Sequence, residues 1–306
     1  MSELTITGTK EKEKKIQIHA INRQSIGDRF KSYLKHPGSL ILLLLVLAAA
    51  VITVAVLIFL IGYILIHGVP YLTADLFSWT YTSENVSMVP AMINTLTMTL
   101  VSLLIAVPLG IGAAIYLVEY AKRGNRLVDI IRLTAETLTG IPSIIYGLFG
   151  MLFFVTALGW KYSMLAGACT LGIMVLPVIM RTTEEALIAV PDSFREGSFG
   201  LGAGRLRTVF KIVLPSAIPG IMSGVILSIG RIVGETAALI YTSGTIAEVA
   251  GIMDSGRTLA LHMYSLSREG LHTNQAYATA VVLLVIVFLI NGLSGLVAKI
   301  FTKGDK

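Results

Sequence analysis

The sequence is poor in charged residues. Of its 306 residues, 14% are charged, whereas about a quarter is usual for a globular domain. Hydrophobic residues make up 55% of the chain, and the mean hydropathy is +0.80. The shortage of charge argues against an ordinary water-soluble domain and predicts an integral membrane protein.

Other features are missing altogether. Cys169 is the single cysteine, so no intrachain disulfide can form, and it is interpreted as a small packing residue. No G-x-x-x-x-G-K-[ST] run occurs, so the chain has no recognisable nucleotide site. The five histidines lack ligand-like spacing, and no nucleophile–histidine set can be argued. We therefore expect no metal, no cofactor and no catalytic site in this chain.

Long apolar runs dominate what remains. A membrane-spanning helix needs about 20 apolar residues. Six segments meet this length: 39–67, 90–118, 133–158, 162–180, 215–240 and 276–300. Pro142 and several glycines interrupt the third, where a kink is expected. These segments predict an all-α polytopic membrane protein with six transmembrane helices.

The polar first 38 residues are expected to form a cytoplasmic tail, with residues 39–306 as the transmembrane domain. The first apolar run is longer than a signal-peptide core, so it is expected to remain as an uncleaved helix. Of the 24 lysines and arginines, 20 fall on one side of the six predicted spans. This bias places both termini in the cytoplasm and explains the net charge of +6 without nucleic-acid binding.

The stretch 185–215 cannot span a membrane, because it combines several charges with four glycines. It predicts a short helix, a glycine turn and a second short amphipathic helix. All of it except Pro215 falls within the expected cytoplasmic coupling loop 181–214, on the side where positive charge collects. Such a charged element between two spans suits contact with a soluble partner.

Two charged residues, Arg231 and Glu235, fall inside the fifth predicted span. On a continuous helix they would share a face with Gly220 and Gly224, since the spacing brings all four to one side. Charges inside a membrane usually face a bundle interior or a water-filled path. Arg231 could attract an anion that Glu235 orients. Alternatively, these charges take part in an ion pair that fixes this helix to a neighbour or to a partner subunit, and both interpretations stay open.

Arg181 closes the fourth predicted span. A helix-end arginine can extend its charged group to the membrane interface while its aliphatic stem stays in the apolar region. The alternative is an anion contact, because the guanidinium fork suits phosphate oxygens.

The stretch 185–215 also resembles a known motif, E-A-A-x3-G-x9-I-x-L-P of ABC-importer permeases. Glu196 begins the match, with Gly197 and Ser198 in place of the alanines. The match is completed at the right spacing by Gly202, Ile212, Leu214 and Pro215. The resemblance implies the type I ABC-importer permease (MetI-like) fold and makes the stretch an ATPase-coupling loop.

Three further phrases resemble the permeases of phosphate importers: 135–150, 181–203 and 231–244. They are nearer to the PstA-like subunit than to its PstC-like partner. The resemblance implies a heterodimer with a PstC-like permease, a PstB-like ATPase dimer that binds the ATP, and an extracytoplasmic phosphate-binding protein. It implies a location in the prokaryotic inner membrane. It also implies Arg181, Arg231 and Glu235 as substrate-path residues.

Three other functions remain open. A sibling permease for molybdate or sulfate would share the loop motif. A secondary transporter would need no ATPase, but it predicts an internal repeat that this sequence does not show. A membrane scaffold or sensor could keep the fold without transport.

Overall fold

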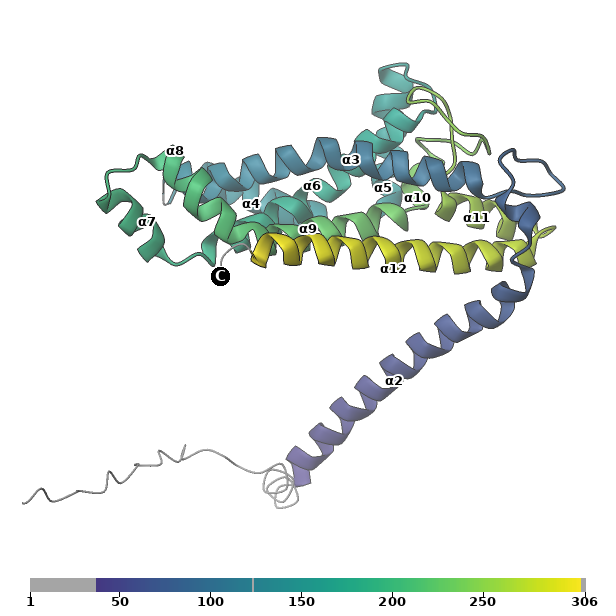
Figure 1. Ribbon diagram of the computed structural model, residues 1–306, viewed down its shortest axis with the longest axis horizontal. Coiled ribbons are helices and arrows are strands. Elements are labelled where there is room, and N and C mark those ends of the chain that lie inside the picture. The colour runs from purple at the N-terminus through teal and green to yellow at the C-terminus, as the bar shows by residue number, and fades with distance from the viewer. Residues whose placement is uncertain (1–36, 123, 304–306) are drawn as a thin grey trace, which may run out of the picture. The chain divides into compact units, whose positions relative to one another are not determined.

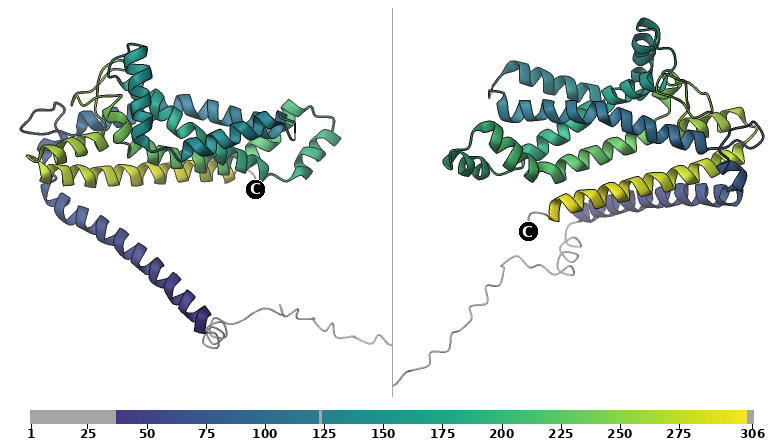
Figure 2. Two further views of the ribbon diagram at one scale, coloured as in Figure 1. Left: turned by 180° about the vertical axis from the view of Figure 1, so that it is seen from behind. Right: turned by 45° about the horizontal axis from the view of Figure 1, so that its top comes forward.

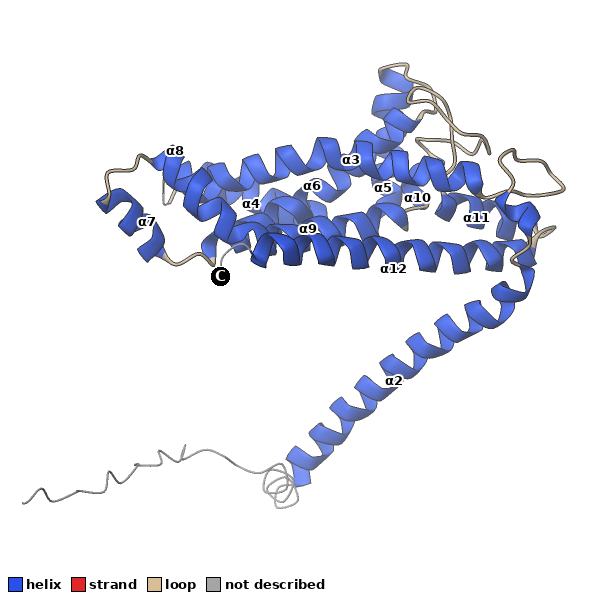
Figure 3. Cartoon of the chain, in the orientation of Figure 1, coloured by secondary structure: helices blue, strands red, loops and turns tan. Residues whose placement is uncertain are grey.

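The computed structural model describes residues 37–303 except residue 123, and this part of the chain is helical without strands (Figures 1 and 3). The α-helices are α2 (Pro37–Gly68), α3 (Val89–Ile115), α4 (Arg126–Thr139), α5 (Ser143–Gly150), α6 (Met164–Ile188), α7 (Asp192–Gly200), α8 (Arg205–Thr208), α9 (Leu214–Val233), α10 (Ala237–Ile240), α11 (Leu259–Glu269) and α12 (Thr273–Lys303). Wider π-helical turns cover Tyr116–Tyr120, Met151–Ala157 and Val209–Val213. The predicted all-α class is confirmed.

Five helices of the described residues are long and apolar enough to cross a membrane: Gly38–Tyr71, Val89–Tyr120, Met164–Ile188, Arg205–Val233 and Thr273–Leu296. They correspond to five of the six predicted spans. The expected tail, residues 1–38, lies outside the described residues except for its last two, which begin α2.

The third predicted span is a bent pair of helices. Arg126–Thr139 and Ser143–Ala157 meet at 103°, so a sixth span exists only if the pair is counted as one. Pro142 lies at the break, with a ψ of 140° that is far from helical. Proline has no N–H to donate and disfavours a helical conformation in the residue before it. The expected kink is therefore a full break.

The chain divides into two units, and the first, up to Leu60, includes most of α2. In that part of α2 nearly every side chain is exposed, and nearly all of them are apolar. A helix that is apolar on all sides is suited to lipid or to a partner.

The second unit, from residue 61 onward, contains the bundle. Helices α3, α6, α9 and α12 run along it, as Figure 2 shows from two sides. Close packing of α9 on α6 depends on glycine, because a Cβ at Gly220 or Gly224 would overlap Ala186 or Thr182. Three buried apolar clusters fill this unit: one near α10, one near α7 and α8, and one where the start of α3 meets α11 and α12.

Candidate coupling and translocation sites

The connection between α6 and α9 contains the predicted helix, glycine turn and second helix. Helix α7 follows Pro191, and the turn after it holds Gly202 at a φ of +82°. This left-handed conformation strongly favours glycine. The second helix is not separate, however, because Arg205–Val233 forms one continuous helix.

This continuity corrects the expectation of a short second helix. Pro215 lies in the middle of the continuous helix and cannot donate the hydrogen bond that an α-helix requires there. The π-helical turn Val209–Val213 comes directly before it and widens the helix at this point. The proline is thus accommodated without a break.

A nearly buried ion pair holds α7 to the end of α3. Arg195 donates from Nε and Nη2 to Glu119 Oε1, at 3.1 and 2.8 Å. It also donates to the carbonyls of Leu187 and Val190 and to the Asp192 carboxylate. The side chains of Glu119 and Arg195 are only 8% and 14% exposed. Every nitrogen of this guanidinium has a partner, so α7 is firmly positioned.

Two further contacts connect the same elements. The hydroxyls of Ser198 on α7 and Thr208 on α8 share a buried hydrogen bond of 2.8 Å. The Arg205 guanidinium lies 5.5 Å from the centre of the Tyr120 ring. A polar cavity of about 680 Å³ lies beside these groups, and Glu119 and Arg195 both line it. Our sequence reasoning missed Glu119, although a glutamate at the end of an apolar run was a usable signal.

The surface of α7 and α8 exposes large apolar side chains. Phe199, Leu206 and Phe210 are about half exposed or more, and Leu201 is 91% exposed. Glu196 lies exposed on α7 next to them. Contiguous exposed apolar groups commonly mark an interaction surface.

The remaining residues of the motif lie at the start of α9. Ile212 is half-buried in the π-helical turn, and Leu214 packs against the nearby apolar cluster. Pro215 is exposed. They therefore connect the exposed surface to the bundle rather than extend it.

Arg231 and Glu235 do not form an ion pair with each other. Helix α9 ends at Val233, and Glu235 lies beyond it, where its Oε1 accepts from the Ala238 N–H at 3.1 Å and caps α10. The expectation that Glu235 shares the helical face of Arg231 is therefore wrong. Gly234 follows the last helical residue, and glycine commonly ends a helix. Arg231 is half-buried and has no ion pair within the described residues.

Arg181 does not close its helix either, since α6 continues to Ile188. Its guanidinium lies 3.3 Å from Glu185 and 3.6 Å from Glu136 of α4. A shorter pair, Arg132–Glu184 at 2.6 Å, joins α4 and α6 beside it. The predicted arginine is thus part of a charge cluster between two helices.

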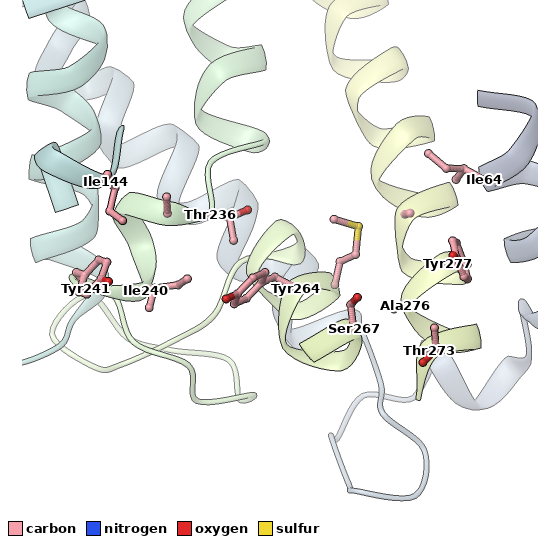
Figure 4. Close-up of a pocket in the computed structure, with 13 residues that line it drawn as sticks. Ile64, Ile144, Thr236, Ile240, Tyr241, Tyr264, Ser267, Thr273, Ala276 and Tyr277 are labelled. Atoms are coloured by element: carbon pink, nitrogen blue, oxygen red, sulfur yellow. The ribbon is translucent and has the colours of Figure 1, made fainter. Parts of the chain in front are cut away.

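A largely apolar cavity of about 600 Å³ lies past the end of α9. Figure 4 shows Tyr264 and Ser267 of α11 between Ile144 and Tyr241 on one side and Tyr277 on the other. Thr236 lines this cavity, but Arg231 and Glu235 do not. No group of three His, Cys, Asp or Glu side chains that could hold a metal occurs in the described part of the chain.

Long apolar helices, with a positioned amphipathic element between two of them, define a polytopic membrane protein with an exposed apolar surface at one end of its bundle. Residues 106–303 match the family described as binding-protein-dependent transport system inner membrane component. The chain belongs to this family.

Two proteins similar to this chain are transport permeases by name. The probable ABC transporter permease protein YqgI of Bacillus subtilis is 36% identical over 74% of this chain and 81% of its own length. The phosphate transport system permease protein PstA 1 of Mycobacterium tuberculosis is 35% identical over 70% of this chain and 71% of its own length.

Solved structures show the same fold. A bacterial alginate ABC transporter matches with a TM-score of 0.64 and 16% identity, over 86% of this chain and 95% of that one. The MetNI methionine ABC transporter matches with a TM-score of 0.59 and 23% identity, over 70% and 95%. The predicted MetI-like permease fold is thereby confirmed.

Proposed function

We propose that this chain is one permease subunit of an ATP-driven importer of inorganic phosphate. The observation that carries the proposal is the α7–Gly202–α8 element, which is exposed at its surface and held at its base by Glu119 and Arg195. The substrate is inferred from relatives at 35–40% identity, which are named as phosphate transport system permeases.

The proposed assembly has four kinds of component. A PstC-like permease forms the other half of the path, and a PstB-like ATPase dimer binds and hydrolyses ATP. An extracytoplasmic protein delivers phosphate. Both termini and α7 face the cytoplasm, because the side with α7 carries most of the lysine and arginine.

In the proposed mechanism, Glu196 and the apolar side chains of α7 and α8 seat in a groove of the ATPase. Closure of the ATPase dimer moves α7, and the ion pair of Arg195 with Glu119 carries that movement to α3. The continuous helix from Arg205 carries it to the opposite end of the bundle. Access to the path thus alternates between the two sides of the membrane.

Arg231 is the proposed anion contact in the path. It is half-buried near the far end of α9 and has no carboxylate partner in the described part of the chain, so its charge is available. Glu235 shapes the path by capping α10. Arg181 is proposed as a contact nearer the cytoplasm, where Glu136 and Glu185 share its charge.

Reconstitution tests the proposal. The chain, both partners and the binding protein are placed in proteoliposomes, and uptake of radiolabelled phosphate is measured with and without ATP. We expect ATP-dependent uptake that excess sulfate or molybdate does not block. Uptake of either of those anions in place of phosphate would assign a sibling transporter, and uptake without the ATPase would assign a secondary transporter.

A matched pair of variants tests the coupling element. Gly202→Val forces a β-branched residue into the left-handed region, whereas Gly204→Val falls at a φ of −75° that valine accepts. Neither added Cβ meets an atom within 4 Å. We expect Gly202→Val to hydrolyse ATP without uptake and Gly204→Val to transport. Equal transport by the two variants would contradict the proposed role of the turn.

A further inference from the structure

The end of the bundle opposite α7 contains a loop that is held against α3. The Asn94 side chain accepts from the Ala250 N–H at 3.0 Å and donates to the carbonyls of Glu248 and Arg257, at 2.8 and 3.2 Å. Thr95 Oγ1 accepts from the Leu259 N–H at 2.8 Å. The backbone on both sides of Arg257 is therefore fixed.

The side chain of Arg257 is also fixed, but it is not satisfied. The residue is 4% exposed, and its guanidinium lies 4.6 Å from the centre of the Tyr81 ring. Its buried Nε and Nη2 have no hydrogen-bond partner, and no ion pair joins it to a carboxylate of the described residues. A buried guanidinium without a counter-charge is costly, so this one is positioned at a cost that a ligand could offset.

The neighbouring histidine, His262, is buried and does not neutralise Arg257. His262 is fully buried on α11, and neither ring nitrogen makes a hydrogen bond of good geometry. Burial, and then the positive charge of Arg257, lower the pKa of His262 to about 3. The imidazole is therefore neutral near pH 7 and leaves the charge of Arg257 uncompensated.

Arg257 lines a cavity of about 360 Å³ together with a second arginine. Arg268 at the end of α11 is exposed, and Glu269 beside it also lines the cavity. Thr245 and Ser265 add hydroxyl groups that can donate hydrogen bonds. With two guanidinium groups and one carboxylate, the cavity has a positive balance of charge.

We propose that this cavity binds a small phosphate-type oxyanion at the end of the bundle opposite α7. Guanidinium groups bind such anions through paired, charge-assisted hydrogen bonds. The choice of inorganic phosphate as the ligand rests on the proposed function. The site differs from Arg231, which does not line this cavity. Phosphate released near the bundle would bind here before it entered the path.

The test measures equilibrium binding of radiolabelled inorganic phosphate. The full-length chain is purified with its partner permease and ATPase in a maltoside detergent, which contains no phosphate. Every version of this chain in the test also carries Arg231→Gln, so that the proposed contact in the path does not contribute to the measured phosphate binding. Arg268→Gln is expected to weaken binding about tenfold. Glu269→Gln is expected to tighten binding about threefold, because a like charge is removed.

Both residues are exposed neighbours, so neither substitution threatens folding. Lys161→Gln, an exposed cation outside the cavity, is the charge control and should leave binding unchanged. Arg257→Lys keeps the charge but loses the fork and should weaken binding further. Unchanged affinity in Arg268→Gln and Glu269→Gln, or shifts in the same direction, would overturn the inference.

A second arm identifies the source of the oxyanion by adding phosphatidylglycerol to the same micelles. Unchanged phosphate affinity assigns the site to free phosphate, and Arg268-dependent displacement assigns it to a lipid headgroup with the same chemistry. If phosphate does not bind but Arg268→Gln weakens docking of the binding protein, the cavity is a protein contact and the inference fails. Binding that persists without any phosphate uptake would count against the proposed function alone.

Discussion

Two arginines at opposite ends of the bundle are both largely buried but differ in their partners. Arg195, beside α7, makes five hydrogen bonds that satisfy every nitrogen of its guanidinium. Arg257, before α11, leaves Nε and Nη2 without partners and contacts the face of Tyr81. Each is held by neighbouring groups, but only one is neutralised by them.

This difference separates two uses of a buried charge. A guanidinium with all partners present joins elements together, because removing any partner would expose an uncompensated charge. A guanidinium that is fixed and unpaired retains capacity for a ligand. The first kind suits the end where force is proposed to enter, and the second suits the end where an anion is proposed to arrive.

The largest effect is expected from breaking the satisfied arginine. Glu119→Ala leaves the Arg195 charge without its main partner, which should cost about 3–5 kcal/mol of stability. Asp192 also pairs with Arg195, but its side chain is 76% exposed. Asp192→Asn should therefore cost less than about 1 kcal/mol. Thermal unfolding in detergent measures both. Similar losses in the two variants would mean that the buried pair does not hold α7.

The second prediction concerns the end with Arg257 and its dependence on pH. Burial and Arg257 lower the pKa of His262 from 6.5 to about 3. The unfolded chain therefore binds a proton between these values that the folded chain does not, and stability falls as the pH drops below about 6.5. At pH 5 the loss is about 2 kcal/mol.

His262→Phe should remove this part of the acid sensitivity, and unfolding followed from pH 7 to pH 5 measures it. His272→Phe is the control, because it removes a partly exposed histidine after the same helix. An identical pH dependence in the two variants would argue against a neutral buried imidazole.

Glycine substitutions at the two ends of the bundle are expected to have smaller effects on stability. Gly202, near α7, is required for its backbone conformation, and Gly202→Ala should cost about 1–2 kcal/mol. Gly150, near α10, is required for space, since a Cβ there would overlap Thr170 and Thr242. Gly150→Ala should cost about 1–3 kcal/mol through overpacking. Gly197→Ala on α7 meets neither limit and should stabilise the helix slightly.

The smallest effect on stability is expected at Arg181. Its pairs with Glu136 and Glu185 join side chains that are more than half exposed, so Arg181→Gln should change stability by less than about 1 kcal/mol. Lower phosphate uptake at normal stability would support its role in the path. Normal uptake would leave it a surface charge.

The spans were predictable because hydropathy is a local property of the chain. Pro142 marked the break between α4 and α5, and Gly234 was a usable signal for the early end of α9. The prediction that Arg231 and Glu235 lie on one helix did not take the helix end at Gly234 into account. An ion pair between Arg231 and Glu235, which was one way to realise an interpretation left open, is therefore not found among the described residues.

Pairings between distant residues were beyond the reach of sequence patterns. Glu119 and Arg195 are 76 residues apart, and Asn94 holds carbonyls more than 150 residues away. Neither spacing has a periodic signature, because only the packing of α3 against later elements creates it. Arg257 was visible in the sequence only as one of two arginines in a long loop.

The continuous helix Arg205–Val233 could rotate as one rigid body about a contact part-way along its length. It packs tightly against α6 at Gly220 and Gly224, where an added Cβ would overlap Ala186 or Thr182. From this contact about 25 Å of helix extend to Arg205 and about 14 Å to Arg231, at 1.5 Å per residue. If it turns there as a rigid body, a displacement at the Arg205 end reaches Arg231 reversed in direction and reduced to about half. Distances measured from spin labels at both ends, with and without ATP, should change in opposite senses.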